Sequence, residues 1–196
     1  MTLERDLEFL YEMGALRFVK RTWVQFLSPT LENNSEHLFR VTWIALVLAR
    51  MEGVKDLGKV ARMALVHDIA ESRTGDVHYV SREFTQRFEE KAIKEMVKET
   101  SLEDIELVWK EYHDRQSLES KIVKDADNLA VDFELHEQEA MGSTLKKNFK
   151  SMREKVAQTK LFTDSAKRMW AAIQTSNPHA WHLNSTNRLN SGDWKK

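Results

Sequence analysis

The stretch Met63-Ala64-Leu65-Val66-His67-Asp68-Ile69-Ala70-Glu71 sets an imidazole and a carboxylate directly after a run of apolar residues. Burying such groups without a partner costs several kcal/mol, so His67 and Asp68 require a counter-ion, a metal ion or another hydrogen-bonding group. On its own, the stretch leaves open whether this pair is functional or only a buried structural pair.

The residues on either side of this stretch have the spacing of an amphipathic helix. We expect a helix from Leu57 to about Arg73 that ends at Gly75, a residue type that readily adopts the left-handed conformation found after helices. In such a helix Glu71 lies one turn beyond His67 on the same face. The inward positions would be Val60, Ala61, Ala64 and Leu65.

The rest of the chain repeats this pattern, and we therefore predict an all-α fold, a single helical bundle. Only two prolines and six glycines interrupt the sequence, and apolar residues recur at three- and four-residue steps. Besides a short helix that carries Leu16, Phe18 and Val19, the expected helices are Leu3–Met13, Asn33–Gly53, Leu57–Arg73, Phe84–Lys98, Leu102–His113, Leu118–Ala140 and Thr163–Ser176.

Two of these segments carry more specific expectations. Asn33 and Glu36 have the spacing of a capping box, so a helix should begin there, after a loop from Trp23 to Asn34 that contains Ser28-Pro29. The helices Phe84–Lys98 and Leu102–His113 are predicted to be purely structural. Their inward residues would be Phe84, Phe88, Met96, Ile105, Val108, Trp109 and Tyr112.

Length and composition favour one domain and a metal site without thiolates. The 196 residues suffice for one core, which we place in residues 1–176, with a polar tail in residues 177–196. The absence of cysteine excludes disulfides, thiolate metal sites and cysteine nucleophiles. A net charge of -1 gives no sign of nucleic-acid or membrane binding. With no targeting or membrane-spanning segment in the sequence, we expect a cytoplasmic protein.

Two further polar residues point to a metal ion. His37 begins a helix that should contact the helix of His67, and Asp127 interrupts an apolar stripe formed by Ala126, Leu129 and Ala130. Two imidazoles and two carboxylates in one core form a ligand set suited to Mn, Co, Zn, Fe or Mg. Glu71 could then reach the attacking water as a general acid or base without binding the ion.

A second His-Asp pair, His113-Asp114, receives the opposite interpretation. Its neighbours are Lys110, Glu111, Arg115 and Gln116, a composition typical of a solvated helix end. We therefore assign His113 to the solvent.

The ordered motifs Ser35-Glu36-His37, His67-Asp68-Ile69-Ala70-Glu71, Gly75-Asp76 and Lys124-Asp125-Ala126-Asp127 resemble those of the HD-domain phosphohydrolases, and most closely the small single-domain 5'-deoxynucleotidases. The resemblance spans roughly residues 16–133. It implies one divalent ion held by His37, His67, Asp68 and Asp127, with Glu71 and Asp76 in catalysis. It also implies a homodimer.

The same resemblance assigns substrate binding to Arg21 and Trp23. Relatives carry an arginine and a tryptophan near the N-terminus that contact phosphate and sugar, and the segment here, Lys20-Arg21-Thr22-Trp23, is one residue shorter. A guanidinium can meet the two charges of a phosphate monoester with a bidentate fork.

The predicted reaction is hydrolysis of a nucleoside 5'-monophosphate. A triphosphate or ppGpp hydrolase is an alternative that needs more basic residues, for which the candidates are Lys20, Arg21, Arg73 and Lys124. A di-iron oxygenase would need two more inward histidines between the His-Asp pair and Asp127, where the chain has only His78 and His113. A non-catalytic module stabilised by its metal ion is a further alternative.

Overall fold

The computed structural model describes residues 1–26 and 31–185, and within them the chain is helical without a β-strand. The predicted all-α class is confirmed. The elements are α1 (Leu3–Ala15), η1 (Leu16–Phe18), η2 (Thr22–Gln25), α2 (Asn34–Met51), α3 (Leu57–Val66), α4 (Glu71–Thr74), η3 (Ser81–Glu83), α5 (Glu89–Val97), α6 (Ile105–Asp114), α7 (Leu118–Ala140), α8 (Leu145–Thr159), α9 (Asp164–Thr175) and α10 (Ala180–Leu183).

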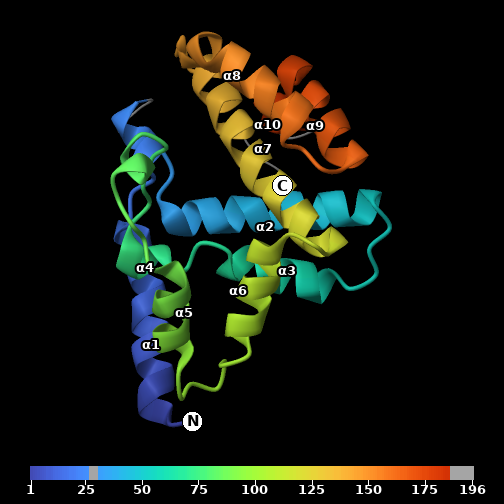
Figure 1. The fold of residues 1–196 in the computed structure, drawn as a ribbon. Coiled ribbons are helices and arrows are strands. Elements are labelled where there is room, and N and C mark those ends of the chain that lie inside the picture. Colours follow the sequence, from blue (N-terminus) through green and yellow to red (C-terminus); the bar gives the residue numbers. More distant parts are fainter. Residues whose placement is uncertain (27–30, 186–196) are drawn as a thin grey trace, which may run out of the picture.

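Helix α2 is the centre of the molecule, with α3 along one side and α7 crossing it (Figure 1). Its start is the predicted capping box: Asn33 accepts from the backbone of Glu36, and the Glu36 carboxylate accepts from the Asn33 amide. The predicted Ser28-Pro29 part of the preceding loop lies outside the described residues. This cap fixes the first turn of α2, where His37 lies.

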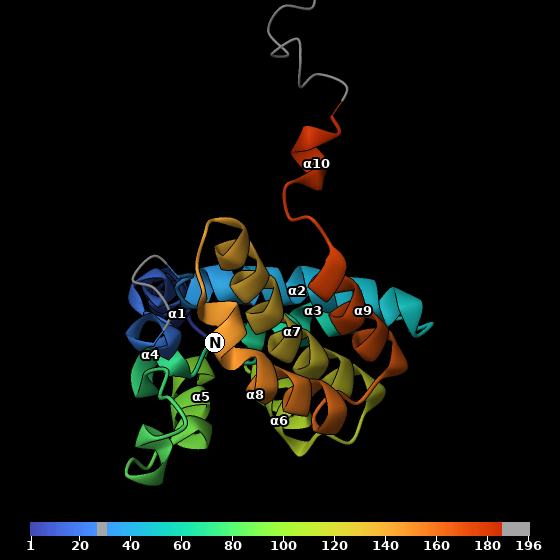
Figure 2. The ribbon, with the colours of Figure 1, turned by 90° about the horizontal axis from the view of Figure 1, so that it is seen from above.

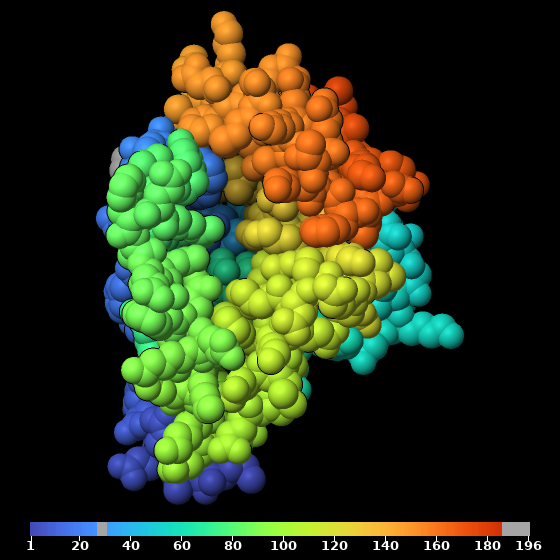
Figure 3. Space-filling view, viewed as in Figure 1, coloured from blue at the N-terminus to red at the C-terminus, as the bar shows by residue number. Residues whose placement is uncertain are grey.

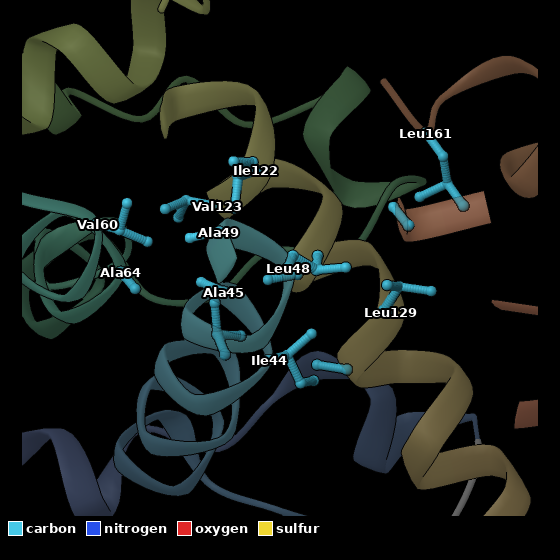
Figure 4. Close-up of a cluster of buried hydrophobic side chains, with 14 of the residues drawn as sticks. Ile44, Ala45, Leu48, Ala49, Val60, Ala64, Ile122, Val123, Leu129 and Leu161 are labelled. Atoms are coloured by element: carbon cyan, nitrogen blue, oxygen red, sulfur yellow. The ribbon is translucent and has the colours of Figure 1, made fainter. Parts of the chain in front are cut away.

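The main core lies where α2, α3 and α7 meet, and α8 and α9 extend it (Figure 4). Leu48, Met63, Ile122 and Leu129 are completely buried there. A second cluster links α1, α5 and α6 through Phe9, Ile93, Met96 and Trp109. Because both clusters border α3, the turn that follows this helix is held from two sides.

The turn after α3 lies where the sequence predicted a continuous helix, so one predicted helix end was wrong. Helix α3 ends at Val66 rather than near Arg73, and residues 67–70 form tight turns in which the amides of Ile69 and Glu71 donate three residues back, to Val66 and Asp68. Glu71 begins the separate short helix α4. Gly75 follows and ends α4 as predicted, but with φ 71° and ψ 156° it adopts an extended conformation of positive φ that glycine allows, rather than the left-handed helical one.

Other predicted details were also wrong. Phe84 and Phe88 are 84% and 60% exposed because α5 begins only at Glu89. Leu65 and Phe18 are exposed as well, and the short second helix is a single 3-10 turn. Helix α8 was not predicted at all. By contrast, α7 has the predicted bounds, and α9 begins after its cap Thr163.

Two features concern the surface and the end of the described chain. No helix within residues 1–26 and 31–185 is long and apolar enough to cross a membrane. The short helix α10 projects away from the bundle (Figure 2).

Candidate active site

His37 is completely buried and approaches the site from the first turn of α2. Its Nδ1 lies 2.9 Å from Oε1 of Glu32. The other ring nitrogen, Nε2, lies 3.2 Å from Oδ1 of Asp127 and 3.8 Å from Oδ2 of Asp68. The Glu32 contact orients the ring so that Nε2 faces the two aspartates.

His67 and Asp68 come from the turn that follows α3. Nδ1 of His67 donates to the carbonyl of Ala64 at 2.7 Å, which leaves Nε2 free to act as a ligand. This Nε2 lies 3.3 Å from Oδ2 of Asp68. Within the described residues, neither Nε2 of His67 nor that of His37 forms a hydrogen bond of acceptable geometry, although both are buried.

Asp127 completes the group from the apolar stripe of α7. His37, His67, Asp68 and Asp127 each offer one ligand atom, and these four atoms lie within 4.8 Å of one another. Ligand atoms about 2.0–2.2 Å from a shared ion have comparable separations. Two buried imidazole nitrogens without a hydrogen bond, beside two carboxylates, therefore fit a divalent metal ion.

Electrostatics keep both aspartates of this group ionised. Burial acts to raise the pKa of Asp127, but Nζ of Lys124 at 2.7 Å and the nearby histidines hold it well below the usual range. For Asp68, the effect of burial is likewise outweighed by His67 and Arg21, which lower its pKa. Both carboxylates are thus charged and available to a cation at neutral pH.

Arg21 is buried beside this group and faces three carboxylates. Its Nη1 lies 3.3 Å from Asp68, 3.5 Å from Asp76 and 3.9 Å from Glu71. Asp76 also accepts from the backbone amide of Thr22 at 2.9 Å. Asp76 therefore holds the segment that carries Arg21 in place.

Trp23 lies two residues after Arg21 and is half-buried at the edge of the same group of residues. Its ring meets that of Phe149 edge to face, with the centroids 5.8 Å apart. Phe149 lies on α8, so a helix that the sequence analysis missed helps to position this predicted substrate residue.

Glu71 is buried next to the four-residue group without being part of it. Its Oε2 accepts from Nδ2 of Asn34 at 3.1 Å, and its Oε1 accepts from Nη1 of Arg87 at 3.3 Å. Burial, reinforced by Asp68 and Asp76, raises the pKa of Glu71 to about 10. It lies close to the predicted place, although its position depends on a turn rather than on one continuous helix with His67.

These residues open into a cavity of about 360 Å³. In Figure 3 it is the hollow between the green segment before α5 and the yellow α6, with α2 and α3 visible behind. The residues of its lining that were not predicted as site residues include Arg82, Arg87, Glu89, Tyr112, His113 and Arg115.

The lining bears on two sets of predicted residues. His113 is exposed at the end of α6, as predicted, but it also lines the cavity, with its ring against that of Trp109. Lys20 and Arg73 do not line the cavity, and Arg73 instead pairs with Glu12 of α1. A basic residue that is close in sequence to a predicted site residue, as Lys20 is to Arg21, therefore does not necessarily face the site.

Two histidines and two aspartates meet at one point of an all-helical fold, beside a buried arginine and a buried glutamate. This is the arrangement expected of a metal-dependent hydrolase.

Comparison with known proteins places the chain within this class. Residues 13–170 match the model of a family described as HD domain. The 5'-deoxynucleotidase HDDC2 of Danio rerio is 32% identical over 146 residues, which cover 71% of this chain and 72% of the relative. The chain belongs to the HD-domain family and is a hydrolase enzyme.

Solved structures show the same fold. A predicted metal-dependent phosphohydrolase from Magnetospirillum magnetotacticum superposes with a TM-score of 0.67 at 25% identity, covering 87% of this chain and 92% of the other. The cyanophage S-2L HD phosphohydrolase DatZ, bound to dA and one catalytic Zn²⁺ ion, gives a TM-score of 0.54 at 16% identity, covering 85% and 96%.

Proposed function

We propose that this chain is a metal-dependent phosphohydrolase that removes phosphate from nucleoside 5'-monophosphates. The observation that carries the proposal is the convergence of His37, His67, Asp68 and Asp127 on one point. Asp68 and Asp127 of this group line a cavity that Arg21 and Glu71 line as well. The relatives named 5'-deoxynucleotidase support this substrate class.

The four converging residues would hold one divalent ion, with Mn, Co, Zn, Fe and Mg as the candidates. A bound ion of this kind supplies positive charge to the phosphoryl oxygens and lowers the pKa of a coordinated water. The protein contributes fixed ligand directions, through the contacts of His37 with Glu32 and of His67 with the Ala64 carbonyl.

Arg21 would bind the phosphate. It is buried and always charged, and its fork matches two phosphate oxygens at once. Asp76 contributes by fixing the Arg21 segment through Thr22, and Trp23 would contact the sugar beside it.

Glu71 would carry the proton. Asn34 and Arg87 fix its two oxygens, while its raised pKa allows it to hold a proton at neutral pH. A carboxyl group of this kind can give a proton to the leaving oxygen and recover one from the attacking water.

The rival enzyme classes find less support. Within the described residues, a single group of three or more metal-binding side chains is present, which disfavours a di-iron oxygenase. His78 bonds with Ser81, and His113 bonds with the Trp109 carbonyl, so neither extends the group. The additional arginines of the cavity leave triphosphates as the alternative to test.

We also propose, from the family resemblance alone, a homodimer in the cytoplasm with its catalytic domain in residues 1–176. The mass of the purified protein in solution tests the first part of this proposal. A monomeric mass at micromolar concentration would contradict it.

A phosphate-release screen tests the proposed substrate class. The purified protein, treated with a chelator and then supplied with Mn²⁺, Co²⁺, Zn²⁺ or Mg²⁺, is given deoxynucleoside and ribonucleoside 5'-monophosphates and the matching triphosphates. We expect phosphate from the monophosphates only when metal is present. Hydrolysis confined to the triphosphates would replace this function with the alternative.

A further inference from the structure

Arg115 has an unusual backbone conformation at the edge of the active-site cavity. It directly follows α6, with φ 56° and ψ 27°, which is the left-handed region. Many helices end with a residue in this region, although residues other than glycine adopt it uncommonly. A role for Arg115 beyond ending α6 therefore depends on the contacts of its side chain.

The guanidinium of Arg115 is anchored next to the proposed metal site. It lies over the ring of Tyr112, 3.8 Å from the centroid, and Nη1 donates to the carbonyl of Ser120 at 3.3 Å. The buried ring of Tyr112 in turn lies 5.3 Å from the ring of His67. One aromatic ring therefore separates this cation from a proposed metal ligand.

Arg115 differs from the other buried or half-buried cations of the cavity in having no acidic partner. Arg21 faces Asp68 and Asp76, Arg87 faces Glu71, and Lys124 faces Asp127, whereas no carboxylate within the described residues forms an ion pair with Arg115. Its hydrogen bond to one carbonyl leaves most of its N–H groups free for a ligand.

Arg115 and Arg21 reach the cavity from different elements. Arg21 belongs to the segment before α2, while Arg115 belongs to the junction of α6 and α7, which forms the other wall in Figure 3. His113 lines the cavity close to Arg115, with its Nδ1 bonded to the Trp109 carbonyl at 2.9 Å. A nucleotide with its phosphate at Arg21 can thus extend its base toward the wall of Arg115.

We propose that Arg115 binds the nucleobase and selects guanine over adenine. A guanidinium only donates hydrogen bonds, and it pairs best with paired acceptors such as O6 and N7 of guanine. Adenine offers an amino group where guanine offers O6, so it loses one acceptor. This inference rests on the proposed function and specifies its substrate class.

The test compares kcat/KM for dGMP, dAMP and deoxyribose 5-phosphate between the parent and Arg115→Gln. Glutamine keeps much of the side-chain length but lacks the charged fork. The parent should favour dGMP over dAMP by about tenfold or more. In Arg115→Gln we expect a loss of about 10- to 100-fold for dGMP, and a change below about twofold for deoxyribose 5-phosphate, which has no base.

A matched control is Arg17→Gln. Arg17 also lies over an aromatic ring, that of Phe18 at 4.7 Å, but it does not line the cavity. This variant should keep the parent preference among bases. Circular dichroism melting of both variants shows whether either has lost its fold.

Three results would overturn the proposal. Equal losses on every substrate, including deoxyribose 5-phosphate, would place Arg115 at the scissile phosphate. A deoxynucleoside 3',5'-bisphosphate is assayed beside these substrates, and a loss confined to it would assign Arg115 to a second phosphate. Parent-like values on all substrates would leave it without a role in binding.

A binding experiment separates failure of this inference from failure of the proposed function. If the metal-loaded parent hydrolyses no monophosphate, equilibrium binding of dGMP and deoxyribose 5-phosphate still measures whether Arg115 contacts the base. Weaker binding of dGMP alone in Arg115→Gln would support base recognition, and equal binding by parent and variant would overturn it.

Discussion

Glu71 and the proposed ligands differ in their surroundings, although all are buried or half-buried carboxylates and imidazoles at one site. Glu71 is fixed by Asn34 and Arg87, whereas the ring nitrogens Nε2 of His37 and His67 have no hydrogen bond within the described residues. The first arrangement suits proton transfer and the second suits ion binding.

Replacing Glu71 by glutamine should separate these two roles. Glutamine keeps the size and much of the hydrogen bonding but cannot carry the proton, so turnover should fall by roughly 10²- to 10⁴-fold. Metal content and Tm should remain close to those of the parent. Both are measured on the sample used for phosphate release. Loss of metal together with activity would make Glu71 a ligand, and parent-like turnover would show that another group carries the proton.

Replacing Arg21 by alanine should weaken catalysis without removing the ion. The variant loses a charge-assisted contact with phosphate, so kcat/KM should fall by about two to three orders of magnitude. Arg21→Lys, which keeps the charge but loses the fork, should recover only part of this loss. Steady-state kinetics with one deoxynucleoside monophosphate measure both variants. Unchanged kinetics in Arg21→Ala would make this residue structural.

Single residues of the site were predictable where a polar side chain interrupts an apolar pattern. Asp127 in the stripe of α7 and the pair after Val66 are of this kind, and the structure brings them together with His37. His113 and Arg115 were missed because their neighbours are polar. A polar composition indicates that a segment is exposed to solvent. It does not indicate whether the segment lies on the open surface or lines a solvent-filled cavity.

Among the helices, prediction failed where the apolar pattern is misleading or weak. Ile69 and Ala70 are buried in the turn after α3, so the periodic pattern runs through a break that only backbone hydrogen bonds reveal. Helix α8 buries only Arg153 and Ala157 and is otherwise rich in lysine. It is amphipathic, but it contains too few apolar residues for a search based on them to find it, although its Phe149 contacts Trp23.

The pairing of α1 with α4 gives a pH-dependent prediction. Arg73 of α4 donates to both carboxylate oxygens of Glu12 at 2.7 Å and lowers its pKa below the ordinary 4.5. Because the folded pKa is depressed, the stabilisation is present above about pH 4.5 and is lost as the pH falls through the folded value. Glu12→Gln should therefore cost about 0.5–1 kcal/mol at pH 7, since the pair is partly exposed, and less at pH 3.

Urea unfolding at both pH values measures this difference. The exposed Glu83, for which the described residues offer no ion pair, provides the control variant Glu83→Gln, which should match the parent at both. An equal cost of Glu12→Gln at pH 7 and pH 3 would contradict a contribution from the charged pair.

Across the whole molecule, the proposed ion would link α2, the turn after α3 and α7. These elements also share the main core, so the ion would join parts that are already packed together. A ligand that binds only the folded state stabilises it by about 2.7 kcal/mol at a concentration one hundred times its Kd.

Replacing His67 by alanine should therefore lower metal content and, in the presence of metal, the Tm. Chelation of the parent should lower its Tm in the same direction, while the variant should respond little to the chelator because it has no ion to lose. Metal analysis and thermal unfolding measure both. Full metal occupancy in His67→Ala would remove this residue from the ligand set.

Phosphate release measured together with metal content gives the most direct test of metal-dependent hydrolysis at this site. Protein stripped by a chelator is titrated with Mn²⁺ or Co²⁺, and each sample is assayed for bound ion and for phosphate released from deoxynucleoside 5'-monophosphates. Release should be absent from the stripped protein and should rise in proportion to bound ion until each chain holds one. Full turnover by the stripped protein, or a loaded protein that releases no phosphate from any monophosphate, would contradict the proposed activity.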